Sequence, residues 1–162
     1  MNEAGIDVRT PQQIAEAVAA GMFRNDRASR AMGMRIIEVG PGRATLEMTV
    51  RDDMLNGFDI CHGGFITTLA DSAFAFACNS YNEMTVASSL SVDLVAVARV
   101  NDVLSARATE VHQAGRTGVY DMTVTNQRGE LVACVRGRSY RMKGRTVVSP
   151  DAPAAQTIGA QP

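Results

Sequence analysis

The sequence lacks the features that mark secreted, metal-binding and nucleic-acid-binding proteins. Its three cysteines, Cys61, Cys78 and Cys134, have neither the spacing of metal ligands nor the dense, even pattern of a disulfide scaffold. Sixteen basic and seventeen acidic residues nearly cancel, and no basic block resembles a nucleic-acid footprint. We therefore expect reduced thiols, no metal or cofactor, and no nucleic acid as partner.

Uninterrupted apolar runs are missing too. The N-terminus carries Glu3, Asp7 and Arg9 where a signal peptide needs a basic start and an apolar stretch. The strongly apolar segment 65–78 is interrupted by Asp71. These absences predict a cytoplasmic protein without a membrane partner.

The length of 162 residues predicts one domain with a single core. We place this domain at residues 10–145, after a flexible polar N-terminus at residues 1–9. Residues 146–162 are predicted to form a disordered tail, because the segment from Ser149 holds three of the five prolines and has no apolar period.

Hydrophobic periodicity predicts an α+β fold. Thr10, Pro11 and Gln13 have the form of a helix start, and a second short helix is expected from Asp26 to near Gly33. From Met34 the period changes to two, which indicates a hairpin around residues 40–42. Four long strands are predicted after a central helix, at Val86–Ala98, Val103–Gln113, Arg116–Asn126 and Glu130–Met142. This order predicts a curved antiparallel sheet wrapped around one buried helix.

The central helix contains one charged residue. Residues 65–78 include ten apolar side chains, and Asp71 is the only charge among them. An ionised carboxylate is rarely buried without a partner or a function. Helical spacing puts Asp71 on one face with Thr67, Thr68 and Phe74, which we interpret as the wall of a substrate pocket. A structural Asp tied to hydroxyls or backbone is the alternative.

Gly63 and Gly64 come directly before this apolar run, in the first helical turn. Backbone N–H groups there have no intrahelical acceptor and lie at the positive end of the helix dipole. They suit an oxygen that gains negative charge, such as a thioester carbonyl under attack. The alternative is that the two glycines only permit a tight turn.

The spacing between Gly63 and Asp71 has a consequence for assembly. Eight residues on one helix separate the two groups by about 12 Å, so they cannot both touch one carbonyl. If both belong to one site, Gly63 of one subunit must face Asp71 of another across a two-fold axis. We therefore expect an obligate dimer with two composite sites.

Other polar residues allow more than one interpretation. Asn56 precedes Gly57 in a plain turn or holds the attacking water, and His62 bonds to loop backbone or acts as a general acid. Cys61 beside His62 is not interpreted as a nucleophile, because nothing else supports thiolate activation. A basic stretch near the end of the last strand forms a solvated edge or a phosphate-binding strip; its members are Arg136, Arg138, Arg141, Lys143 and Arg145.

Several short motifs resemble those of the hotdog-fold acyl-CoA thioesterases, and more narrowly of the phenylacetate-degradation thioesterases. The resemblance covers roughly residues 22–142, and its motifs are Asn56-Gly57, Cys61-His62-Gly63-Gly64, Leu69-Ala70-Asp71-Ser72-Ala73-Phe74-Ala75, Ala77-Cys78-Asn79-Ser80 and Thr117-Gly118-Val119-Tyr120-Asp121. One departure is Val95-Ala96, where the family usually has Arg-Pro.

The resemblance implies hydrolysis of an aryl-acetyl-CoA substrate by a dimer of dimers. It implies an oxyanion contact at the Gly63 amide, Asp71 as nucleophile or general base, Asn56 orienting water, and Ser72 at a position where the family usually has a hydroxyl. Substrate contacts are expected at Gly64, Thr67, Thr68, Phe74, Arg116, Arg138 and Lys143, and the sequence does not tell which of the basic residues meet the coenzyme phosphates.

Two other functions fit the same scaffold. Hydration or dehydration of an enoyl thioester would require a catalytic Asp and His acting together, and neither histidine lies five residues after an aspartate. A non-catalytic acyl-CoA binding module would need no carboxylate, and it would need an output element that the sequence does not contain.

Overall fold

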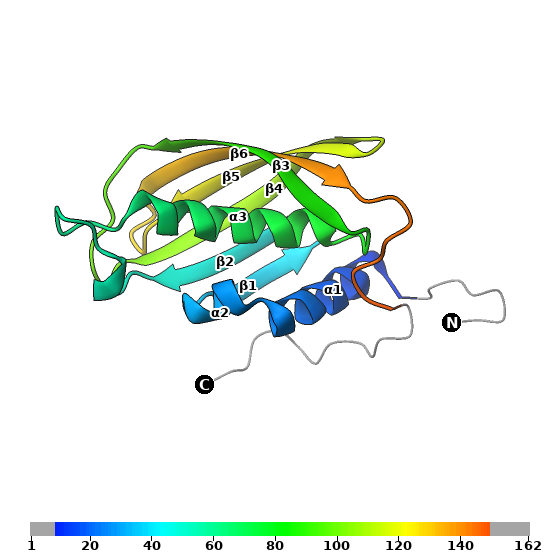
Figure 1. The fold of residues 1–162 in the computed structure, drawn as a ribbon, viewed down its shortest axis with the longest axis horizontal. Coiled ribbons are helices and arrows are strands. Elements are labelled where there is room, and N and C mark those ends of the chain that lie inside the picture. Colours follow the sequence, from blue (N-terminus) through cyan, green and yellow to red (C-terminus); the bar gives the residue numbers. More distant parts are fainter. Residues whose placement is uncertain (1–8, 150–162) are drawn as a thin grey trace.

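The structure, a computed structural model, describes residues 9–149. Six strands form one antiparallel sheet in the order β1-β2-β4-β5-β6-β3. The strands are β1 (Arg35–Gly40), β2 (Arg43–Thr49), β3 (Thr85–Leu94), β4 (Val103–Ala114), β5 (Thr117–Thr125) and β6 (Leu131–Arg141). The long helix α3 (Gly63–Asn79) lies across one face of this sheet, which confirms the predicted α+β arrangement (Figure 1).

Two shorter helices precede the sheet. In α1 (Pro11–Asn25) the Thr10 hydroxyl accepts the Gln13 N–H at 3.2 Å, and the Gln13 side chain accepts the Thr10 N–H at 2.8 Å. This reciprocal cap confirms the predicted helix start. Asp26 then caps the five-residue helix α2 (Arg27–Ala31) by accepting the Ser29 N–H. A single 3₁₀ turn, η1 (Asp52–Met54), was not predicted.

Three of the four long strands were predicted to within one residue at each end, whereas the predicted end of β3 was wrong. The strand stops at Leu94 instead of Ala98. The N–H groups of Val95 and Ala96 both donate to the Val132 carbonyl, and the Ala98 carbonyl accepts the Cys61 N–H. These bonds turn the chain away from the sheet edge and toward the start of α3.

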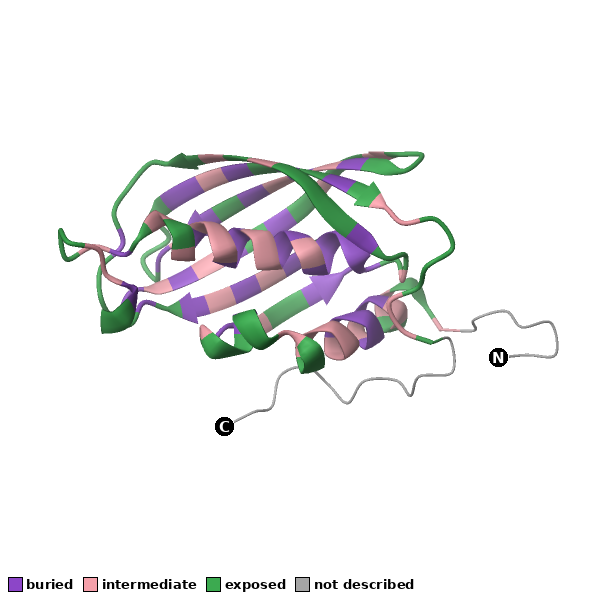
Figure 2. Cartoon of the chain, viewed as in Figure 1, coloured by how far each residue is buried: buried purple, intermediate pink, exposed green. Residues whose placement is uncertain are grey.

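The core fills the space between α3 and the sheet. Phe74 is completely buried, and its ring centroid lies 5.2 Å from that of Tyr120 on β5. A Cβ atom on Gly137 would lie 2.9 Å from the Phe74 ring, so the strand approaches the helix closely only because this residue is glycine. Buried residues therefore concentrate on the inner sides of α3 and of the central strands (Figure 2).

The two edge strands differ in their surroundings, since α1 contacts β1 whereas β3 is largely exposed. β1 is interrupted by a bulge after Ile36, and the Gln12 side chain of α1 donates to the Val39 carbonyl at 2.8 Å. β3 pairs only with β6, and most of its ten residues are exposed (Figure 2). The β3 edge therefore presents backbone groups that can pair with another strand.

The described chain continues beyond the predicted domain end at residue 145. The Asn82 side chain accepts the N–H groups of Val147 and Val148 and donates to the Val148 carbonyl at 3.0 Å. Four residues of the predicted tail, 146–149, are thus described next to the domain. The rest of that tail and residues 1–8 lie outside the described residues.

Candidate active site

The first turn of α3 leaves one backbone donor free. The Gly64 N–H donates to His62 Nδ1 at 3.0 Å, and the Phe65 N–H donates to the His62 carbonyl at 3.0 Å. Among residues 9–149 the Gly63 N–H has no acceptor. Of the two predicted glycine amides, Gly63 can therefore bind a ligand oxygen, whereas the Gly64 amide is already occupied.

Gly63 is also constrained by its neighbour on β3. A Cβ atom at this position would lie 2.5 Å from Leu94 Cδ1. The Leu94 side chain thus occupies the space beside Gly63 that any other residue would need. Glycine keeps the N–H accessible and permits this contact.

Asp71 lies two turns further along α3 and is half-buried. Its carboxylate forms no hydrogen bond or ion pair with any residue in the described part of the chain. Burial raises the pKa of Asp71 above its ordinary value, because desolvation disfavours the charged form. The alternative was a structural Asp bonded to hydroxyls or backbone, but Asp71 has no such hydrogen-bond partner among the described residues.

The hydroxyls that could have stabilised the Asp71 carboxylate bond elsewhere. Thr67 donates to the Gly63 carbonyl and Thr68 to the Gly64 carbonyl, each at 2.8 Å. Both are ordinary back-bonds to the preceding helical turn. No hydroxyl therefore counteracts the effect of burial on the pKa of Asp71.

Ser72 faces α2. The Ser29 hydroxyl donates to Asp26 Oδ2 at 2.6 Å, since a carboxylate only accepts. With its proton used there, Ser29 must accept from Ser72 at an oxygen separation of 2.9 Å. Because Ser29 is buried, this relay ties α2 to α3. This chain of hydrogen bonds, which we call the Asp26–Ser29–Ser72 relay, was not predicted. The only sequence signal for it was Asp26 at the start of a predicted helix.

The loop before α3 holds Asn56 and His62 in defined orientations. Asn56 Oδ1 accepts the Phe58 N–H at 2.9 Å, which leaves its Nδ2 group without an acceptor in residues 9–149. The His62 ring caps Gly64 through Nδ1 and lies edge-on to the Phe65 ring. Asn56 therefore forms the predicted turn and still has a free donor, and His62 forms the predicted backbone bond.

The remaining predicted residues do not converge with these groups. Phe74 lies in the core, where it is completely buried. Arg138 and Lys143 are exposed on and after β6. Arg116 lies over the Tyr140 ring at 4.7 Å. The described chain brings none of the three cations into contact with Gly63 or Asp71.

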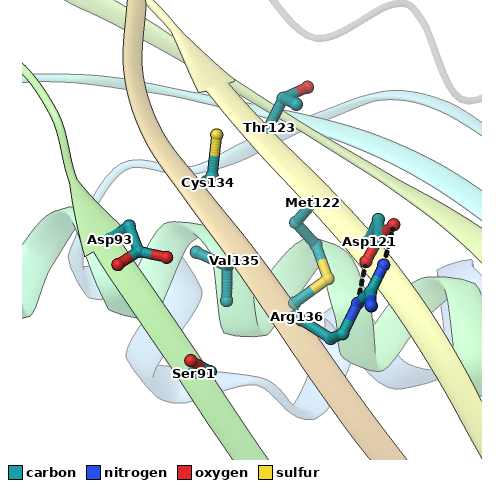
Figure 3. A pocket seen from close by; sticks show the side chains of 8 residues that line it. All are labelled: Ser91, Asp93, Asp121, Met122, Thr123, Cys134, Val135 and Arg136. Atoms are coloured by element: carbon teal, nitrogen blue, oxygen red, sulfur yellow. Dashed lines mark hydrogen bonds and ion pairs between the residues drawn. The ribbon is translucent and has the colours of Figure 1, made fainter.

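A hollow on the outer side of the sheet contains none of the predicted catalytic residues, and of the predicted basic stretch it contains Arg136. Figure 3 shows it with α3 behind the strands, and its lining residues are Ser91, Asp93, Asp121, Met122, Thr123, Cys134, Val135 and Arg136. Its one cation, Arg136, forms a bidentate pair with Asp121 at 2.7 and 2.8 Å. No group of three or more potential metal ligands occurs among the described residues, and none of their helices is long and apolar enough to cross a bilayer.

Comparison with known proteins identifies the family. The thioesterase superfamily model matches residues 58–133. An acyl-coenzyme A thioesterase PaaI of Escherichia coli K12 is 44% identical over 126 residues, which are 78% of this chain and 90% of the relative. The chain belongs to the thioesterase superfamily. This thioesterase is a hydrolase of thioester bonds, as the motifs around Gly63 and Asp71 predicted.

Solved structures agree with this assignment and confirm the hotdog fold. The E. coli PaaI protein from the phenylacetic acid degradation operon superposes with a TM-score of 0.83 and 42% identity, covering 85% of this chain and 99% of that one. A Streptococcus mutans UA159 protein bound to acetyl-CoA matches with a TM-score of 0.67 and 26% identity, covering 70% of this thioesterase and 91% of that chain.

Proposed function

We propose that this thioesterase hydrolyses an aryl-acetyl-CoA thioester, phenylacetyl-CoA or hydroxyphenylacetyl-CoA, to the free acid and coenzyme A. The proposal rests on two chemical groups that lie on the same helix. α3 offers one free backbone donor at Gly63 and one unpartnered carboxylate at Asp71. These are the two groups that thioester hydrolysis requires, a donor for the oxyanion and a base or nucleophile.

The chemistry follows from these groups. The Gly63 N–H binds the carbonyl oxygen and stabilises the negative charge that develops on it. Asp71 either attacks the carbonyl carbon, forming an anhydride and expelling the thiolate, or takes a proton from a water that attacks the same carbon. Asn56 Nδ2 orients that water. His62 keeps Nδ1 as an acceptor for Gly64, so in its neutral form the ring proton is on Nε2, where it can donate a hydrogen bond to the sulfur of the leaving thiolate.

The site is composite in this proposal. About 12 Å separates Gly63 from Asp71 on one helix, so the donor and the acid that meet one carbonyl come from two subunits. The exposed ten-residue edge of β3 supports a two-fold dimer in which two such edges pair and bring the α3 helices antiparallel. Two dimers then associate into a tetramer, as the resemblance implies.

Cations without a carboxylate partner are the best candidates for the coenzyme phosphates. Arg136 is paired with Asp121, and Arg141 with Glu83. Arg116, Arg138 and Lys143 form no ion pair within the described residues. Of the cations already expected to contact substrate, all three are thus available, and we assign phosphate contacts to them; the acetyl-CoA bound to the S. mutans relative supports a coenzyme ligand.

Replacement of Asp71 by Asn tests the proposal. The amide is nearly isosteric but can act neither as base nor as nucleophile, so turnover of phenylacetyl-CoA should fall by about 10² or more while the substrate still binds. Thiol release measured with a chromogenic disulfide reports turnover. Asp121→Asn, an aspartate on the outer side of the sheet, is the matched control and should retain activity. Wild-type turnover in Asp71→Asn would exclude the proposal.

A further inference from the structure

The segment beside the Gly63 amide is apolar and exposed. Leu94, the last residue of β3, is 51% exposed although its Cδ1 atom lies against Gly63. Val95 and Val97 follow with exposures of 55% and 53%. We call residues 94–97 the apolar rim. About half of Leu94 is not covered by other residues of this chain, although the residue lies against Gly63.

The side chains of the apolar rim offer no hydrogen bonding to a ligand held by Gly63. Its four side chains carry no polar atom. The N–H groups of Val95 and Ala96 are already used by the Val132 carbonyl. The pantetheine arm of coenzyme A carries an amide two carbons from the sulfur, and that amide would need a polar partner here. An acyl group would need none.

Geometry limits which part of the acyl group touches Leu94. A carbonyl oxygen that accepts the Gly63 N–H lies about 2.9 Å from that nitrogen, so the carbonyl carbon and its substituents lie within van der Waals reach of the surroundings of Gly63. Leu94 Cδ1 lies within those surroundings, since a Gly63 Cβ would approach it to 2.5 Å.

We infer that Leu94 is a specificity-determining residue that contacts the α-carbon of the acyl group and selects thioesters with an unbranched α-carbon. Such substrates carry a CH₂ next to the carbonyl, as linear acyl and aryl-acetyl thioesters do. A branched α-carbon, or a ring attached directly to the carbonyl, collides with the Leu94 methyl groups. This inference rests on the proposed function and adds the acyl class to it.

The test compares kcat/KM for phenylacetyl-CoA with that for benzoyl-CoA and isobutyryl-CoA. Leu94→Ala removes the methyl groups and should raise the ratio of branched to unbranched substrates by about tenfold or more, since tenfold is the lower end of the effect of one methylene in an apolar pocket. Leu94→Val, which removes one carbon, should shift the ratio in the same direction by roughly fourfold. Leu94→Met conserves volume and should keep the wild-type ratio within about twofold.

Leu131→Ala is the matched control, because Leu131 is also a half-exposed leucine at a strand end. It should leave the ratio unchanged. An unchanged ratio in folded Leu94→Ala or Leu94→Val overturns the inference, as does an equal change for all three substrates, which would place the pantetheine arm or the subunit interface at Leu94. Sedimentation of each variant identifies loss of the dimer. If the wild type hydrolyses none of the substrates, the proposed function itself fails.

Discussion

At the scale of single residues, Gly63 meets two requirements at once. Its N–H is the free donor of the first turn of α3, and its missing Cβ leaves room for Leu94. These requirements can be separated by substitution. Proline is tolerated at the first helical position, and His62, with ψ of 130°, already has the backbone conformation that proline demands of the residue before it.

Gly63→Pro and Gly63→Ala therefore form a matched pair. Both add a Cβ atom beside Leu94, but only proline removes the N–H group. If that N–H stabilises the oxyanion, kcat of the proline variant should be about 10²–10³ lower than that of the alanine variant. Circular dichroism checks that both retain the helix. Equal kcat values in the two variants would assign the oxyanion contact elsewhere.

The raised pKa of Asp71 gives a pH dependence with a definite sign. The active carboxylate forms only as pH rises through this raised pKa, so hydrolysis should be lost on acidification at a pH above the ordinary carboxyl value of about 4. Between those two pKa values the folded chain binds more protons than the unfolded chain, and the free energy of unfolding therefore falls as pH rises.

Asp71→Asn should consequently melt at a higher temperature than the wild type at pH 7, and the difference should shrink in acid. Thermal melts of both proteins at pH 4 and pH 7 measure this. A kcat/KM profile of the wild type with its acidic midpoint at or below pH 4 would contradict the assignment of Asp71 as the active group.

At the scale of elements, the Asp26–Ser29–Ser72 relay holds α2 against α3. Ser29→Ala leaves the hydroxyl of Ser72 and one carboxylate oxygen of Asp26 without their partner, so the free energy of unfolding should fall by about 1–3 kcal/mol. Urea titration measures this loss, and exposed Ser88→Ala, whose hydroxyl also forms one hydrogen bond, is the control. The kcat per folded molecule should stay within about twofold. A large fall in kcat with unchanged stability would instead place the relay in the reaction.

Sequence patterns predicted the helices and strands that depend on residues close together in the chain. The capping residues Thr10 and Gln13 and the alternation along β4 to β6 determine those elements through neighbouring side chains. The end of β3 could not be predicted, because Val95 to Ala98 continue the apolar pattern and only bonds to distant Val132 and Cys61 turn the chain away.

The same limit applies to the site. Asp71 and Gly63 were found because each is chemically unusual in its segment. The position of Phe74 in the core, the relay to Ser29, and the contact of Leu94 with Gly63 depend on how separate elements pack. These contacts join residues far apart in the chain, and the spacing of residues in the sequence does not indicate them.

At the scale of the whole molecule, the proposed composite site predicts complementation. Asp71→Asn and Gly63→Pro should each be nearly inactive alone. In a mixed dimer one site carries both changes and the other carries neither, so remixing the two variants after dissociation should recover up to about a quarter of wild-type activity. Random reassociation makes half of the dimers mixed, and each has one intact site. No recovery, in dimers shown to be mixed by mass spectrometry, would mean that both groups act within one subunit.

Asn82 binds the backbone of Val147 and Val148 through three hydrogen bonds. Asn82 follows the C-terminal end of α3, and the seventeen-residue helix puts about 24 Å between that end and Gly63. A fluorescent dye or immobilisation handle attached next to Ser149 would therefore start on the side of the subunit remote from its own Gly63 amide.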